Sequence, residues 1–275
     1  MGNLRFKNKC FLAPMAEIND IAFRLLCKKA GAGLVYTGMV NPLTKQTLVL
    51  DDKPVIQLFS MDGRGIKEFI KKYEGKAQLF DFNLGCPARV AERSGIGSYL
   101  TRDLKTIEKI LKEMRKATKK PITIKLRKGP NTLKIVKIAE KYCDGICIHP
   151  RTKEQGYSGK ADVEYAERLK KGTKLSVIYS GDVDENNVKG LLKKFDFVMV
   201  GRKAIGNPNI FAKIAGKKAV FGFNDYLKLA LKYKFKFSHI KSQAMYFTKN
   251  QKNAKELRGK LVKAQKISDI RKIMA

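Results

Sequence analysis

A chain of 275 residues in which 44% of the side chains are hydrophobic can form one large domain, alone or with a small appendage. Its 58 lysines and arginines outnumber its 25 aspartates and glutamates, so the formal net charge is +33. Such a surface favours a polyanionic partner, with RNA or DNA as the first candidate. A general lysine enrichment, as in some thermophiles, is the alternative. Glutamate is not enriched alongside lysine, however, so ion-pair networks do not absorb the excess.

The cysteines and histidines argue against a metal site. Five cysteines (Cys10, Cys27, Cys86, Cys143 and Cys147) show no C-x-x-C spacing, and the chain has only two histidines. No apolar run approaches the length of a membrane span, and the amino terminus lacks the pattern of a signal peptide. We therefore expect a soluble, cytoplasmic protein without a metal ion.

Short apolar segments alternate with amphipathic ones along the first 200 residues. The apolar segments predict buried strands at 10–14, 34–37, 55–58, 78–82, 121–125, 145–148, 176–179 and 197–200. The amphipathic segments predict helices at 18–30, 63–73, 104–118, 133–142, 163–169 and 185–193, the last capped by Asp184. This alternation predicts a (β/α)₈ TIM barrel.

The sequence changes character after about residue 216. Helical segments at 225–237, 238–248, 254–264 and 268–274 follow without a strand signal and carry many lysines. We therefore divide the chain into a barrel, residues 1–216, and a small all-α domain, residues 217–275. The basic face of the second domain is either solvated or binds a nucleic-acid backbone.

A thiol stands at the carboxyl end of the fourth predicted strand, the end at which barrels of this kind carry out chemistry. Cys86 lies between Gly85, which permits a sharp turn, and Pro87, which fixes the next φ. A lone cysteine is commonly a buried apolar residue. The residues at the other strand ends favour a functional role instead, because so many of them are polar or conformationally special. They are Pro14, Met15, Ala16, Gln57, Asn83, Lys125, His149, Ser180, Gly181, Asp182, Gly201 and Arg202.

Some of these residues indicate a bound anion. Gly181 and Gly201 follow the seventh and eighth strands, where barrels often bind a phosphate through backbone N–H groups, and Arg202 adds charge. Lys125 lies in an otherwise apolar strand, and a buried ammonium group must find an anion or lose its proton. A structural ion pair is the alternative for Lys125. The position of His149 at a strand end favours contact with a ligand or substrate over a role in the core.

These motifs resemble those of the tRNA-dihydrouridine synthases. The likeness extends in order over nearly the whole barrel, and the helical segments resemble the tRNA-binding domain of that family more loosely. Three positions depart from the family pattern, since Glu17 and Pro150 each replace a glycine and Ser180 replaces an asparagine. The matching segments are Leu12-Ala13-Pro14-Met15-Ala16, Gln57-Leu58-Phe59, Asn83-Leu84-Gly85-Cys86-Pro87, Gly97-Ser98, the run from His149 to Gly159, Gly181-Asp182 and Gly201-Arg202.

The resemblance implies an enzyme that reduces the C5–C6 double bond of particular uridines in tRNA. It implies FMN as the cofactor, reduced by NADPH (or NADH), with hydride passing from flavin N5 to C6. Cys86 would donate the proton to C5, and a thiol suits this role because it is protonated at neutral pH yet can release its proton. Asn83 would orient the uracil.

The remaining roles follow from the same resemblance and from the charge of the tail. Arg151 and Tyr157 would line the substrate side of the site. Lys241, Lys249 and Arg258 would contact the tRNA backbone. The residues implied for FMN are Pro14, Met15, Ala16, Gln57, Lys125, His149, Ser180, Gly181, Asp182, Gly201 and Arg202.

Two other functions stay open at this point. An FMN barrel that acts on a free pyrimidine, like dihydroorotate dehydrogenase, leaves the net charge and the helical tail without a role. A non-catalytic barrel that binds RNA accounts for the charge, but it would carry no flavin.

Overall fold

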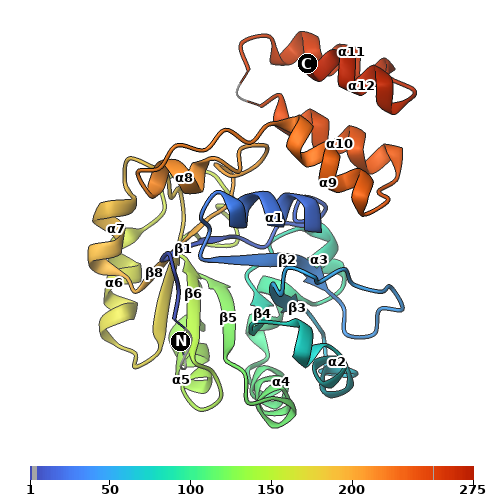
Figure 1. The fold of residues 1–275 in the computed structure, drawn as a ribbon. Coiled ribbons are helices and arrows are strands. Elements are labelled where there is room, and N and C mark those ends of the chain that lie inside the picture. Colours follow the sequence, from blue (N-terminus) through green and yellow to red (C-terminus); the bar gives the residue numbers. More distant parts are fainter. Residues whose placement is uncertain (2–4, 250) are drawn as a thin grey trace.

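The computed structural model describes residues 1, 5–249 and 251–275. Eight parallel strands close into a barrel in which each strand pairs with the next and β8 pairs with β1 (Figure 1). This confirms the predicted (β/α)₈ fold. The strands are β1 (Cys10–Leu12), β2 (Leu34–Val40), β3 (Val55–Leu58), β4 (Phe80–Leu84), β5 (Ile122–Arg127), β6 (Gly145–His149), β7 (Ser176–Ser180) and β8 (Phe197–Val200).

The helices surround the barrel and then continue beyond it (Figure 1). Those of the barrel are α1 (Ile21–Lys29), α2 (Ile66–Tyr73), α3 (Arg89–Arg93), α4 (Leu104–Ala117), α5 (Thr132–Ala139), α6 (Val163–Lys171), α7 (Val188–Lys194) and α8 (Ile210–Ile214). The helices of the tail are α9 (Phe223–Lys232), α10 (Phe237–Phe247), α11 (Ala254–Lys263) and α12 (Ile267–Met274). No helix within the described ranges combines the length and the hydropathy that a membrane crossing requires.

The connection from β2 to β3 carries no helix, although a regular (β/α)₈ barrel has one after each strand. The residues of this connection are all described, and they form turns and loops over 41–54. Arg24 on α1 holds the segment through a bidentate ion pair with Asp52 at 2.8 Å and a hydrogen bond to the carbonyl oxygen of Val49. This buried ion pair anchors an irregular backbone against α1.

The predicted cap at Asp184 is wrong. Helix α7 begins at Val188, and its N-terminal flanking residue is Asn187. The carboxylate of Asp184 instead accepts hydrogen bonds from the backbone N–H groups of Asn186 and Asn187, at 3.0 and 3.2 Å. Asp184 thus closes the turn before the helix, where the same short acceptor side chain is favoured.

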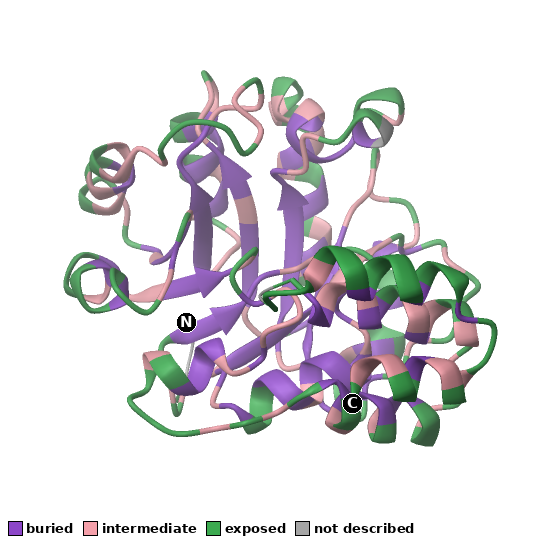
Figure 2. Ribbon diagram, turned by 90° about the horizontal axis from the view of Figure 1, so that it is seen from above, coloured by how far each residue is buried: buried purple, intermediate pink, exposed green. Residues whose placement is uncertain are grey.

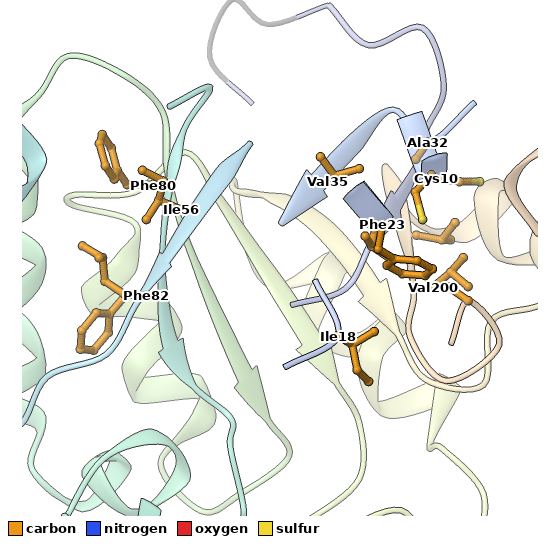
Figure 3. Close-up of a cluster of buried hydrophobic side chains, with 14 of the residues drawn as sticks. Cys10, Ile18, Phe23, Ala32, Val35, Ile56, Phe80, Phe82 and Val200 are labelled. Atoms are coloured by element: carbon orange, nitrogen blue, oxygen red, sulfur yellow. The ribbon is translucent and has the colours of Figure 1, made fainter. Parts of the chain in front are cut away.

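Strand residues alternate between two environments. Phe80 and Phe82 on β4 lie close to Ile56 on β3 in the layer between strands and helices (Figure 3). Between them in sequence stand Asp81 and Asn83, whose side chains point to the opposite face of the sheet, the barrel interior. The strands are almost wholly buried, whereas the helices expose their outer faces (Figure 2). Polar residues therefore occur inside the barrel at alternate positions of strands that are apolar on the outside.

The tail packs on α1 and is tied to it by one carboxylate. Asp20 caps α1 by accepting from the backbone N–H of Phe23 with one oxygen. Its other oxygen accepts from Tyr226 at 3.1 Å, His239 at 2.9 Å and Gln243 at 2.7 Å. Since α9 and α10 share one hydrophobic cluster with the barrel, the division of the chain at residue 216 stays a prediction.

Candidate active site

A cavity of about 680 Å³ opens at the carboxyl ends of the strands, which is within the range of small-molecule sites. All residues predicted for the cofactor except Ala16 and Gln57 contribute to its wall. The predicted substrate residue Tyr157 does so as well. The cavity therefore joins the ends of β1, β5, β6, β7 and β8, as expected for a barrel of this class.

One end of the cavity is a cradle of bare backbone. Gly181 has φ +155°, and a Cβ atom there would lie 2.9 Å from the Cβ of Ala161. Only glycine suits this position, and it leaves the backbone open to a ligand. Gly201 and Arg202, which follow the adjacent strand β8, also line the cavity. An exposed backbone beside a cation suits a phosphate group.

Asp182 organises two arginines beside this cradle. Its carboxylate accepts from Nη2 of Arg202 at 2.7 Å and from Nη2 of Arg151. Arg151 also donates to the carbonyl oxygens of Ser158 and Gly159, and only 2% of it is exposed. The guanidinium of Arg151, predicted on the substrate side, is thus occupied by protein acceptors and holds the segment after β6 in place.

His149 is neutral in this setting. Nε2 of His149 lies 3.2 Å from Nη1 of Arg151, and an arginine only donates, so Nε2 is the acceptor and Nδ1 carries the proton. Burial, together with the charges of Lys125, Arg127, Arg151 and Arg202, lowers the pKa of His149 to about 2. The imidazole therefore offers one N–H donor and no charge.

Lys125 has the environment expected of an anion-binding residue. It is half-buried in β5, between Ile124 and Leu126, and its side chain contributes to the cavity wall. Its ammonium group forms no hydrogen bond or ion pair with any described residue. Because a desolvated cation without a partner is costly, an anionic or electron-rich ligand atom fits this position.

Neither Asn83 nor Cys86 lines this cavity, but Asn83 on β4 pairs in register with Lys125 of its wall on β5. Oδ1 of Asn83 accepts from the backbone N–H groups of Gly85 at 3.2 Å and of Cys86 at 3.0 Å. The carbonyl oxygen of Cys86 accepts from the N–H of Ser98 at 3.1 Å and from its hydroxyl at 2.9 Å. Cys86 itself is half-buried at the carboxyl end of its strand, as the sequence predicts.

Gln57, predicted for the cofactor, lies away from the cavity wall and is fully buried. Its Nε2 donates to Asp81 at 2.7 Å, and its Oε1 accepts from Nδ2 of Asn83 at 2.9 Å. Gln57 therefore connects Asp81 in the barrel interior to the residue that holds the Cys86 loop.

Sequence reasoning missed Arg127, a buried residue at the end of β5. It donates to the carbonyl oxygens of Gly85, Thr152 and Gly156, at 2.9, 3.1 and 2.7 Å. The ring of Tyr157 lies 5.3 Å from its guanidinium carbon. Asp81 was missed as well. Both residues could have been found from the alternation of polar and apolar residues along their strands, because each occupies the inward face of a strand whose outward face is apolar.

The tail residues predicted to bind tRNA lie in different places. Lys249, after α10, contributes to the cavity wall and donates to the carbonyl oxygen of Arg202 at 2.9 Å. Lys241 donates to the carbonyl oxygens of Val262 and Ala264 near the end of α11. The side chain of Arg258 donates to the hydroxyl of Thr248 at 2.8 Å. The structure thus brings Lys249 to the barrel mouth, while Lys241 and Arg258 form hydrogen bonds with other residues of the tail.

No group of three metal-ligating side chains suited to an ion occurs in the described part of the chain.

Among solved structures, a variant of NCR from Zymomonas mobilis has a TM-score of 0.58 at 12% identity, covering 81% of this chain and 93% of the other. That likeness shows the barrel fold alone. A probable tRNA-dihydrouridine synthase of Rickettsia bellii is 35% identical over 236 residues, which are 78% of this chain and 72% of the relative. The tRNA-dihydrouridine synthase B of Vibrio vulnificus is 33% identical over 235 residues, which are 78% of this chain and 73% of the relative. The model of the dihydrouridine synthase (Dus) family matches residues 11–272. This chain belongs to the dihydrouridine synthase family.

Proposed function

We propose that this protein reduces particular uridines in tRNA to dihydrouridine with bound FMN, which NADPH or NADH reduces beforehand. The observation that carries the proposal is the arrangement at the barrel mouth. Two glycines, a neutral His149 and a Lys125 that pairs with no described residue line one cavity, and Asn83, which holds the Cys86 loop, pairs in register with Lys125. A tRNA substrate also accounts for the net charge of +33 and implies a cytoplasmic enzyme.

The residues of the cavity fit the parts of FMN. Gly181, Gly201 and Arg202 suit its phosphate, and Lys125 suits the electron-rich edge of its ring. His149 offers Nδ1–H as a donor, since its Nε2 is occupied by Arg151. Pro14 and Met15 add further wall to the cavity. When bound there, the flavin supplies the hydride that adds to C6 of the uracil.

Cys86 supplies the proton that C5 needs after hydride addition. The hydrogen bonds from Ser98 and to Asn83 fix the backbone on which the thiol stands. Asn83 uses both lone pairs of Oδ1 on the loop and one N–H on Gln57, so one N–H remains to orient a uracil carbonyl. Tyr157, which is 57% exposed at the cavity rim, offers an aromatic surface to an extruded nucleotide.

Extruding a uridine from folded tRNA costs a few kcal/mol, and phosphate contacts from basic side chains can offset that cost. We propose Lys241, Lys249 and Arg258 for these contacts, with Lys249 nearest the cavity. If so, the logarithm of the tRNA affinity falls linearly with the logarithm of the salt concentration. A flat dependence on salt speaks against phosphate contacts.

The proposal is tested with purified protein and tRNA from a strain that lacks the gene. We expect a yellow protein whose released flavin is FMN, and we expect dihydrouridine at defined positions after addition of NADPH. Free uridine and orotate serve as competing substrates, and reduction of orotate in place of tRNA would refute the proposal. In Cys86→Ala we expect bound flavin and tRNA affinity to persist while uridine reduction is lost. Full activity in that variant removes Cys86 from the reaction.

A further inference from the structure

A continuous chain of hydrogen bonds runs through the barrel interior to the Cys86 loop. The hydroxyl of Thr123 and the side-chain amide of Gln57 both donate to the carboxylate of Asp81. Gln57 accepts from Asn83, and Asn83 accepts from the backbone N–H groups of the loop. Thr123, Asp81 and Gln57 are fully buried. The chain thus spans β5, β4 and β3 before it reaches the thiol-bearing residue.

The carboxylate sets the direction of this chain. An ionised carboxylate only accepts hydrogen bonds, so Gln57 must turn its NH₂ group toward Asp81 and its carbonyl toward Asn83. Asn83 must then donate to Gln57 and direct its own carbonyl to the loop. Each amide is fixed by the one before it, and the final acceptor meets the N–H of Cys86 at 3.0 Å.

A carboxylate at this position is costly to the fold. Burial raises the pKa of Asp81 to about 6, against the lowering effects of Thr123, Gln57 and Lys125. The other titratable groups that sense this charge are Tyr36 on β2 and Cys147 on β6, with Cys143 before β6, and burial keeps all three uncharged at neutral pH. An apolar side chain would be cheaper to bury, so a role in orienting the loop explains why a carboxylate stands there.

We propose that Asp81 is a positioning residue that acts through Gln57 and Asn83 to hold the Cys86 loop in its productive geometry. The inference rests on the proposed function in so far as Cys86 delivers the proton. Asp81 does not touch the substrate. It acts by fixing which atoms of the two amides face the loop.

The test interrupts the chain of hydrogen bonds at two points. Asp81→Val removes the acceptor, and Gln57→Met removes the link at similar volume, which also covers the case in which the first variant does not fold. For each we expect kcat to fall about 10- to 100-fold, the scale of a small misplacement of reacting groups. The KM for tRNA and the affinity for FMN should stay within about twofold, because the cavity wall and the tail are untouched. Because the two residues act in series, the double variant should lose no more than the worse single one.

Two variants serve as controls. Asp81→Asn keeps a carbonyl acceptor for Gln57, so we expect it to retain kcat within about fivefold, the difference between a charged and a neutral hydrogen bond. Tyr36→Phe removes a buried hydroxyl that lies near Thr123 and Asp81 but forms no hydrogen bond with a described residue, so the links from Asp81 to the Cys86 loop stay intact. Its kcat should be unchanged.

A second measurement separates this inference from the proposed function. The rate at which iodoacetamide alkylates Cys86, followed by peptide mass spectrometry, reports the geometry of the loop without any tRNA. We expect Asp81→Val and Gln57→Met to change that rate in the same direction, and Tyr36→Phe to leave it unchanged. Failure of the wild type to reduce tRNA would reject the function yet leave this comparison valid. Two results would overturn the role of Asp81. One is an unchanged alkylation rate in both Asp81→Val and Gln57→Met when both are folded, and the other is a double variant in which the two losses of kcat multiply.

Discussion

Nε of Arg127 donates to the carbonyl oxygen of Gly85 at 2.9 Å, one residue before Cys86. The same guanidinium donates through Nη1 to Thr152 and Gly156 in the segment after β6. One buried side chain therefore ties the thiol-bearing loop to the segment that carries Tyr157. Neither loop can shift without breaking a hydrogen bond to a charged donor, which is among the stronger hydrogen bonds in proteins.

Replacement of Arg127 by methionine should release both loops at once. We expect a loss of stability of about 2 kcal/mol, because three carbonyl oxygens lose their donor. We also expect uridine reduction to fall about 10- to 100-fold. Urea denaturation and single-turnover reduction of tRNA measure the two effects. The flavin content should stay close to that of the wild type, since Arg127 does not form part of the cavity wall, and wild-type turnover would show that the two loops hold their places independently.

Two glycines behind the Cys86 loop form a matched pair for testing close packing. Gly95 and Gly97 both have φ +61°, so alanine is strained equally at either position. At Gly95 a Cβ atom meets nothing within 4 Å, whereas at Gly97 it would lie 2.8 Å from the carbonyl oxygen of Cys86. We expect Gly95→Ala to cost about 1 kcal/mol with activity retained. Gly97→Ala should cost more and should also lower the rate of uridine reduction, whereas equal effects of the two substitutions contradict the packing argument.

Glu17 occupies a left-handed conformation, with φ +61°, where the related family usually has glycine. Since its side chain is exposed, little is lost when it is removed. We expect Glu17→Gly to raise the free energy of unfolding by about 1 kcal/mol. Lys53→Gly, at φ +46° and also exposed, is the control away from the cavity. Thermal and urea denaturation of both variants check this prediction. A destabilised Glu17→Gly would mean that the glutamate side chain stabilises the fold by more than its backbone strain costs.

The buried carboxylate of Asp81 should leave a mark on the pH dependence of stability. With its pKa raised to about 6, the folded chain holds a proton between pH 4 and 6 that the unfolded chain has released. The contribution of this group to stability is therefore present at low pH and is lost as the pH rises through 6. At pH 7 we expect Asp81→Asn to be more stable than the wild type by about 2 to 3 kcal/mol, a gap that closes toward pH 4. Urea denaturation at several pH values measures the gap, and a gap that widens on acidification contradicts the assignment.

The fold was accessible from the sequence because strands buried on both faces and separated by amphipathic helices have few stable arrangements. The residues at the strand ends were accessible for a related reason, since the carboxyl ends of parallel strands meet at one mouth. Pro14, Lys125, His149 and Arg202 accordingly lie around one cavity.

Contacts between distant segments could not be predicted in this way. Nothing local to Arg127 indicates that it will meet the carbonyl oxygens of Gly85 and Gly156, and nothing local to Gln57 indicates that it will link Asp81 to Asn83. These pairings depend on the register between strands, which the structure supplies. The connection from β2 to β3 also depends on a contact between distant segments, because Arg24 on α1 pairs there with Asp52.

Asp20 serves at once as the cap of α1 and as the common acceptor for Tyr226, His239 and Gln243 of the tail. Three hydrogen bonds to one carboxylate therefore hold the tail in its orientation against the first helix of the barrel. A nucleic acid that contacts both parts would meet them in the relative orientation that this carboxylate holds. A change in which nucleotide reaches the cavity would then come from new side chains on α10 and α11, with the shared carboxylate and the docking of the tail left intact.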